Sequence, residues 1–154
     1  MATSENSAEE KSQTVRADRV LVIDDELELL RALSGTLRRA GYAVRTAHSA
    51  ERGLTLLEQE PAELVITDII MPRKSGLEVI AKVRELYPGT RVIAMSGCGD
   101  FGLAGYRRST GITTFAYLDA SERAGAHAVL AKPFEAEQIL TRVREVLDAP
   151  LEQI

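Results

Sequence analysis

The feature of this chain that most constrains its fold is a regular alternation between two kinds of apolar pattern. From Arg19 onward, short apolar runs rich in Val, Ile and Leu alternate with longer stretches in which apolar residues recur at helical spacing. This alternation is typical of βα units, in which each strand of a parallel sheet is followed by a helix that packs against it. The pattern therefore predicts an α/β fold.

Five βα units follow one another, which predicts a doubly wound, five-stranded parallel sheet of the flavodoxin-like type with strand order 2-1-3-4-5. The expected strands are Arg19–Ile23, Tyr42–Ala47, Leu64–Thr67, Arg91–Met95 and Ala128–Ala131. The expected helices are Leu27–Ala40, one that begins after Ser49 and ends before Pro61, Leu77–Tyr87, and Glu135–Leu147. Five glycines interrupt the segment between residues 97 and 111, where only Thr114–Ala124 resembles a helix, so the course of this connection is not predicted.

A chain of 154 residues is expected to form one domain. Residues 1–17 are polar, carry few large apolar side chains and show no periodicity, so we expect a disordered N-terminal tail. Residues 18–148 contain all five βα units and form the expected domain, and residues 149–154 form a short C-terminal tail.

The composition disfavours several classes of protein. A net charge of −4 and an aromatic content of 5% argue against a surface that binds nucleic acid directly. No apolar run reaches the length of a membrane span, and the start of the chain lacks the pattern of a signal peptide. The single cysteine, Cys98, fits a reducing compartment. We therefore expect a cytoplasmic protein that does not insert into membranes.

Polar residues stand at the point where four of the expected strands stop. Asp24 and Asp25 follow the first strand and Asp68 follows the third, while Ser96 and Lys132 follow the fourth and fifth. The carboxyl ends of parallel strands share one edge of a sheet, so these side chains are expected to meet there. Three carboxylates, a hydroxyl and an ammonium group at one edge predict a site for a divalent cation and a phosphoryl group.

Each residue of this set also has an ordinary structural explanation when it is taken alone. An Asp before a helix is most often an N-cap, an Asp or Ser after a strand often begins a turn, and a single Lys is usually solvated. Because all five residues are expected at one edge of the sheet, a shared binding site is favoured over separate structural explanations. His48 and His127 have no Cys or carboxylate partner at ligand spacing, so we expect neither to bind a metal or act in catalysis.

Several short motifs carry a resemblance to a known family. They are Asp24-Asp25, Asp68-Ile69-Ile70-Met71-Pro72 followed by Ser75-Gly76-Leu77, Ser96, and Lys132-Pro133-Phe134. With these motifs the chain resembles the CheY-like receiver domains of two-component response regulators, from Arg19 to about Leu147. Only seven residues follow Leu147, which predicts a receiver of the stand-alone type.

The resemblance implies the function of each site residue. Asp68 is the expected phosphoacceptor, which forms 4-aspartylphosphate with a phosphoryl group from a histidine kinase or a histidine phosphotransfer protein. Mg²⁺ is the implied cofactor, held directly by Asp25 and Asp68, by the backbone carbonyl of Ile70, and by Asp24 directly or through water. Ser96 and Lys132 are expected to contact the phosphoryl oxygens.

The resemblance also implies a signalling domain rather than an enzyme with an external substrate. Its downstream target is a protein that the sequence does not name, and its oligomeric state is not predicted. A cis peptide bond between Lys132 and Pro133 is expected. Two features depart from the family pattern: Val129 replaces the usual Tyr or Phe, and the segment between Ser96 and Lys132 is long and rich in glycine.

Two enzyme classes on the same fold remain as alternatives. The segment from Gly97 to Gly102 matches the dinucleotide-binding pattern GxGxxG, with Asp119 near the position of a ribose-binding acid, but no clear helix follows it. A metal-dependent hydrolase with an Asp nucleophile would need a second acid two residues after Asp68, where Ile70 stands.

Overall fold

The computed structural model describes residues 17–97 and 119–151. Its strands are β1 (Arg19–Ile23), β2 (Ala43–Ala47), β3 (Leu64–Asp68), β4 (Arg91–Gly97) and β5 (Ala128–Lys132). Its labelled helices are α2 (Leu27–Arg39), α3 (Ala50–Gln59), α4 (Gly76–Leu86) and α6 (Ala136–Asp148). Residues 119–124 are also helical. The strands form one sheet in the order β2-β1-β3-β4-β5, with every pair parallel, as predicted.

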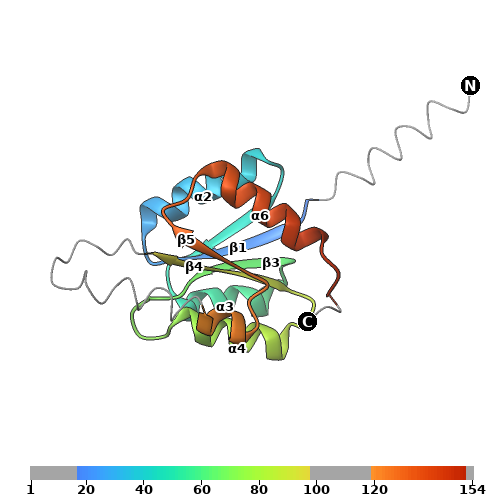
Figure 1. Ribbon diagram of the computed structural model, residues 1–154. Coiled ribbons are helices and arrows are strands. Elements are labelled where there is room, and N and C mark those ends of the chain that lie inside the picture. The colour runs from blue at the N-terminus through green and yellow to red at the C-terminus, as the bar shows by residue number, and fades with distance from the viewer. Residues whose placement is uncertain (1–16, 98–118, 152–154) are drawn as a thin grey trace, which may run out of the picture.

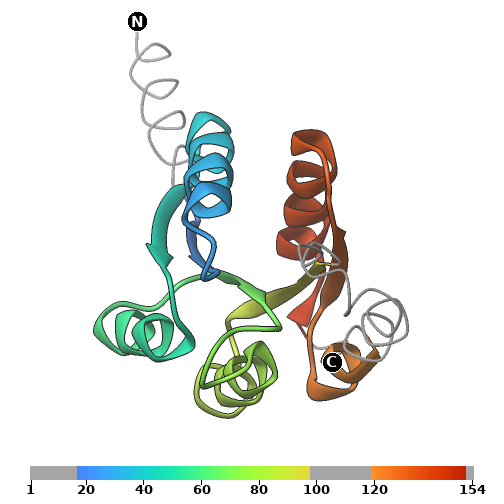
Figure 2. The same ribbon diagram turned by 90° about the vertical axis from the view of Figure 1, so that its left-hand side faces the viewer.

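The helices cover both faces of the sheet. Helices α2 and α6 lie on one face, while α3, α4 and residues 119–124 lie on the other (Figures 1 and 2). Side chains alternate along each strand, so each face has its own apolar cluster. Val22 and Ile66 belong to the cluster beneath α2 and α6. Leu21 and Val65, their neighbours in sequence, belong to the cluster beneath α3 and α4.

Local sequence signals explain where the helices begin and end. Ser49 accepts a hydrogen bond from the backbone N–H of Arg52 and so caps α3. Glu135 and Gln138 form a reciprocal capping box at the start of α6. Gly41 follows α2 with a φ of 103°, a conformation that glycine adopts without steric cost. These signals keep the observed bounds of the helices within one residue of the predicted ones.

The sheet brings the ends of four strands together. Asp24 directly follows β1, Asp68 ends β3, and Lys132 ends β5. In the ladder between β4 and β5, Ser96 pairs with Ala131, one position before Lys132. The expected helix at Thr114–Ala124 is confirmed for residues 119–124, and its earlier part lies outside the described residues, as do Cys98 and the glycine-rich segment after it. In the described ranges no helix is both long and apolar enough to cross a membrane.

Candidate functional site

Three carboxylates meet at the carboxyl edge of the sheet. Asp24, Asp25 and Asp68 each offer one oxygen, and these oxygens all lie within 4.8 Å of one another. Asp24 is fully buried and Asp68 is 6% exposed, whereas Asp25 faces solvent. Carboxylates at this separation repel one another, and burial of two of them strengthens the repulsion. This cluster of three carboxylates, called the carboxylate pocket below, therefore has the charge and the oxygen donors that a divalent cation needs.

Hydrogen bonds hold the backbone N–H and both carboxylate oxygens of Asp24. Its backbone N–H donates to the carbonyl of Ala47 at 3.1 Å, which continues the ladder between β1 and β2. Its Oδ1 accepts the N–H of Glu26 at 2.8 Å, and its Oδ2 accepts from Lys132 Nζ at 2.7 Å. Burial of a carboxylate costs free energy unless it is paired, and this carboxylate is fully paired.

Lys132 supplies positive charge to the pocket from the end of β5. Its side chain is 14% exposed, and Nζ lies 2.7 Å from Asp24 Oδ2 and 3.6 Å from Asp68 Oδ1. Burial lowers the pKa of Lys132, but the charges of Asp68 and Asp24 outweigh burial and raise this pKa above its ordinary value. The side chain is therefore an ammonium ion at neutral pH. The peptide bond between Lys132 and Pro133 is cis, as predicted.

Asp68 lies close to the other two carboxylates and to the ammonium group. Its Oδ1 accepts a hydrogen bond from the backbone N–H of Ile69 at 3.0 Å. Burial, followed by the charge of Asp24, raises the pKa of Asp68 to about 7, although Lys132 acts in the opposite direction. A carboxyl group with this pKa is partly protonated and partly ionised near neutral pH. Such a perturbed carboxyl in a polar pocket is typical of a functional site.

The loop after β3 passes so close to Asp68 that only glycine fits at the start of α4. A Cβ atom on Gly76 would lie 2.0 Å from the backbone oxygen of Asp68. The N–H of Gly76 donates to the carbonyl of Ile69 at 2.8 Å, which closes this loop. Within the loop, Arg73 has a φ of 72°, a conformation that costs free energy for a residue with a side chain.

Ser96 is fully buried, and its hydroxyl has no hydrogen-bond partner among the described residues. A buried hydroxyl without a partner costs free energy, which makes Ser96 a candidate binding residue. Ile70 follows Asp68 by two residues and is 45% exposed, and its carbonyl as a metal ligand stays a prediction. Val129 pairs with Ala94 and packs against the cluster beneath α3 and α4.

Sequence reasoning missed the structural role of His127. Its ring Nδ1 accepts the backbone N–H of Val92 at 3.0 Å, and the backbone N–H of His127 donates to the carbonyl of Val92 at 2.8 Å. Burial, then the charges of Arg84 and Arg91, lowers the pKa of His127, so the neutral ring that can accept this bond is favoured. The histidine therefore joins β4 to the residues before β5. Only a lone histidine before a predicted strand was visible in the sequence.

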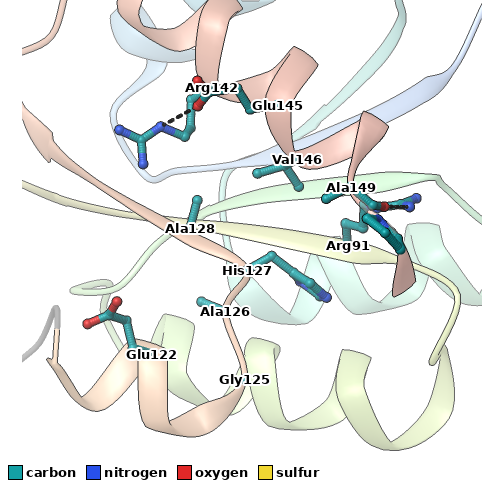
Figure 3. Close-up of a pocket in the computed structure, with 11 residues that line it drawn as sticks. Arg91, Glu122, Gly125, Ala126, His127, Ala128, Arg142, Glu145, Val146 and Ala149 are labelled. Atoms are coloured by element: carbon teal, nitrogen blue, oxygen red, sulfur yellow. Dashed lines mark hydrogen bonds and ion pairs between the residues drawn. The ribbon is translucent and has the colours of Figure 1, made fainter. Parts of the chain in front are cut away.

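A separate hollow of about 430 Å³ is lined in part by His127 (Figure 3). His127 directly precedes β5, so the hollow lies at the opposite end of this strand from Lys132. Arg91, Glu122, Arg142 and Glu145 contribute to its lining, with charges of both signs. It contains none of the residues predicted to form the site. The candidate functional site is therefore the carboxylate pocket.

The doubly wound parallel sheet, with a buried acidic pocket and a lysine at its carboxyl edge, defines a class of α/β proteins that bind phosphoryl groups or ligands at this edge. Within that class, the family model of the response regulator receiver domain matches residues 20–144. The chain belongs to the receiver domain family of response regulators.

Relatives and solved structures agree with this assignment. The chain is 31% identical over 138 residues to the DNA-binding transcriptional regulator NtrC of Bradyrhizobium sp. (strain RP501 Parasponia), covering 90% of this chain and 26% of that protein. It is 31% identical over 126 residues to the transcriptional regulatory protein DltR of Streptococcus agalactiae serotype III (strain NEM316), a match that covers 82% of this chain and 50% of that protein. The chain thus spans half or less of these two relatives.

A receiver domain protein (CheY-like) from Methanospirillum hungatei JF-1 has a similar crystal structure. The TM-score is 0.71 at 28% sequence identity, and the match covers 86% of this chain and 95% of that chain. The predicted family and fold are therefore confirmed, and the chain functions as the receiver domain of a two-component system.

Proposed function

We propose that Asp68 is the residue that takes the phosphoryl group, and that Asp24, Asp25, Ser96 and Lys132 assist it. The observation that carries this proposal is the position of Asp68, which lies within 4.8 Å of two carboxylate oxygens and 3.6 Å from an ammonium group. Asp68 is buried, and burial followed by the charge of Asp24 raises its pKa to about 7. Carboxylates are recognised nucleophiles in phosphoryl transfer.

The pocket fits Mg²⁺ as its cofactor. The ion prefers hard oxygen ligands, and the three carboxylates supply them within one small region. Asp25 and Asp68 would hold the ion directly, Asp24 directly or through water, and the Ile70 carbonyl would add a ligand. When bound, Mg²⁺ supplies positive charge to the phosphoryl oxygens. Its charge would also offset the burial and the repulsion from Asp24 that together raise the pKa of Asp68.

The reaction transfers one phosphoryl group to the protein. An oxygen of the ionised Asp68 attacks phosphorus, and the bond from phosphorus to the nitrogen of a phosphohistidine, or to the oxygen of an acyl phosphate, breaks. The leaving group keeps the electron pair of that bond. Lys132 stabilises the charge that spreads over the phosphoryl oxygens, and the Ser96 hydroxyl, which has no partner among the described residues, donates to one of them.

We further propose that the domain signals through protein contact and turns over no external substrate. The expected phosphodonor is a histidine kinase or a histidine phosphotransfer protein. The relatives include regulators that bind DNA, but that activity is theirs and the downstream target of this chain stays open. The cytoplasmic location and the stand-alone organisation with tails at 1–17 and 149–154 stay predictions. Among residues 17–97 and 119–151, no observation favours an enzyme of the nucleotide-binding or hydrolytic type.

Intact-mass measurement tests the proposal. With acetyl phosphate and Mg²⁺, the parent protein is expected to gain one phosphoryl group, and it is expected to gain none when the metal is chelated. Asp68→Asn is expected to remain unmodified under both conditions. Asp148→Asn, which changes an exposed residue at the end of α6, serves as the matched control and should be modified like the parent. Full modification of Asp68→Asn would contradict the assignment.

A further inference from the structure

Thr67 precedes Asp68 on β3 and is fully buried. It pairs with Ile23 on β1 and with Ala94 on β4, and both of these belong to the apolar cluster beneath α3 and α4. A hydroxyl in such surroundings is costly unless it finds a partner. In this fold its partner is the backbone carbonyl of Asp68, to which Thr67 Oγ1 donates at 2.9 Å.

The peptide group between Asp68 and Ile69 also contacts the Asp68 carboxylate. The carbonyl oxygen of this peptide belongs to Asp68 and accepts from Thr67, while its N–H belongs to Ile69 and donates to Asp68 Oδ1 at 3.0 Å. That N–H also donates to the carbonyl of Met95 on β4 at 3.0 Å. The rotation of this peptide plane therefore sets the orientation of the carboxylate. A hydrogen bond on the carbonyl also polarises the N–H and strengthens its bond to the carboxylate.

Close contacts hold this peptide in its orientation, and the hydrogen bond from Thr67 is one of them. Gly76, at the start of α4, lies so close that a Cβ atom there would be 2.0 Å from the Asp68 carbonyl oxygen. The carbonyl oxygen of this peptide thus accepts from Thr67 and lies against the start of α4. Its N–H donates to Met95 on β4 and to the Asp68 carboxylate. Loss of the Thr67 hydroxyl would leave a buried carbonyl with one partner fewer, and rotation of the peptide would be the response.

We propose that Thr67 is a positioning residue for phosphoryl transfer: its hydroxyl fixes the peptide plane between Asp68 and Ile69 and thereby holds the Asp68 carboxylate in its attacking orientation. This inference rests on the proposed function of Asp68 as the phosphoacceptor. Thr67 touches neither the donor nor the phosphoryl group. Its effect is on the geometry of the nucleophile, and small errors in such geometry reduce rates strongly.

Thr90 provides a matched control at the other end of the sheet. It is 3% exposed, and its Oγ1 donates to the carbonyl of Ala62 at 2.7 Å, next to the start of β4. Thr67→Val and Thr90→Val each replace a buried threonine by its isostere and each remove one hydroxyl-to-carbonyl bond. The two variants are therefore expected to lose similar stability, and only the first changes the region of Asp68.

The test measures phosphorylation rates against the concentration of acetyl phosphate at saturating Mg²⁺. Thr67→Val is expected to lower the maximal rate about tenfold, with the half-saturating donor concentration little changed. Thr67→Ser, which keeps the hydroxyl, is expected to restore most of the rate, and Thr90→Val is expected to match the parent. Thr67→Ala removes the hydroxyl without adding an atom, and it gives the same test if the valine variant does not fold.

An unchanged rate in both Thr67→Val and Thr67→Ala would overturn the inference. An equal loss of rate in Thr90→Val, or no rescue by Thr67→Ser, would also overturn it, because the effect would then follow stability rather than the orientation of Asp68. A failure of the proposed function of Asp68 would look different. The parent protein itself would then show no phosphorylation that depends on Mg²⁺, and the proposals for both Asp68 and Thr67 would be wrong.

Discussion

At the scale of single residues, Asp68 lies in surroundings that oppose its own charge. Burial and the nearby Asp24 raise its pKa from 3.8 to about 7, while Lys132 and the N–H of Ile69 favour its charged form. The metal-free protein therefore binds a proton at Asp68 more tightly than the unfolded chain does. By linkage, the stability gained from this proton is present below pH 4 and is lost as the pH rises toward 7.

Asp68→Asn removes this pH dependence because an amide does not ionise. Without Mg²⁺, we expect the variant to be more stable than the parent at pH 8 by roughly 1–3 kcal/mol, and close to the parent at pH 4. Urea unfolding at the two pH values measures the difference. Asp148→Asn, at an exposed position, is the control and should follow the parent at both. A constant difference between Asp68→Asn and the parent from pH 4 to pH 8 would contradict the explanation.

The sequence predicted the charged residues of the site because each one stands where an apolar run ends, and parallel strands bring such ends together. It could not predict that Thr67 donates to the Asp68 carbonyl. The direction of a hydroxyl depends on the strands and helices around it, and Thr67 looks like an ordinary β-branched strand residue. The lack of a partner for the Ser96 hydroxyl among the described residues is likewise visible only in three dimensions.

At the scale of elements, the bounds of the described helices and strands were predictable to within two residues, because turn residues and caps mark most of them. The connection after β4 was not predictable, since its glycines and weak periodicity favour no single structure. The bond between the His127 ring and the N–H of Val92 was also unforeseen, because it depends on the register of β4 and β5.

The start of α4 gives a prediction at this scale. Gly76→Ala places a Cβ atom 2.0 Å from the Asp68 carbonyl oxygen, so either the helix or the Asp68 peptide must move. We expect a loss of stability of at least about 2 kcal/mol and slower phosphorylation. Gly89→Ala is the matched control, because nothing lies within 4 Å of the added atom. Equal stability of the two alanine variants in urea unfolding would show that the close approach is not real.

At the scale of the whole molecule, the topology joins parts of the chain that are far apart in sequence. Asp24 and Lys132 are separated by 108 positions, yet they form a hydrogen bond of 2.7 Å. The order of the strands places β3 at the centre, with β1 on one side of it and β4, followed by β5, on the other. The pocket therefore exists only when the sheet is complete, so a ligand of the pocket stabilises the entire fold.

Magnesium is therefore expected to raise the midpoint of thermal unfolding, because it binds the folded protein alone. At a concentration about 100 times the dissociation constant, the gain is about 2.7 kcal/mol. Asp25→Asn should lose most of this gain, because it removes a carboxylate of the pocket. Glu28→Gln, an exposed change in the first turn of α2, should keep it. A full magnesium response in Asp25→Asn would exclude Asp25 as a ligand.

Chemical trapping of the phosphorylated residue tests the central claim most directly. Borohydride reduces an aspartyl phosphate to homoserine, so the protein is treated with acetyl phosphate and Mg²⁺, reduced, digested and read by peptide mass spectrometry. We expect homoserine at position 68 alone, and none when Mg²⁺ is chelated. Homoserine at Asp24 or Asp25, or its absence from a protein that gained a phosphoryl group, would contradict the assignment of Asp68 as the phosphoacceptor.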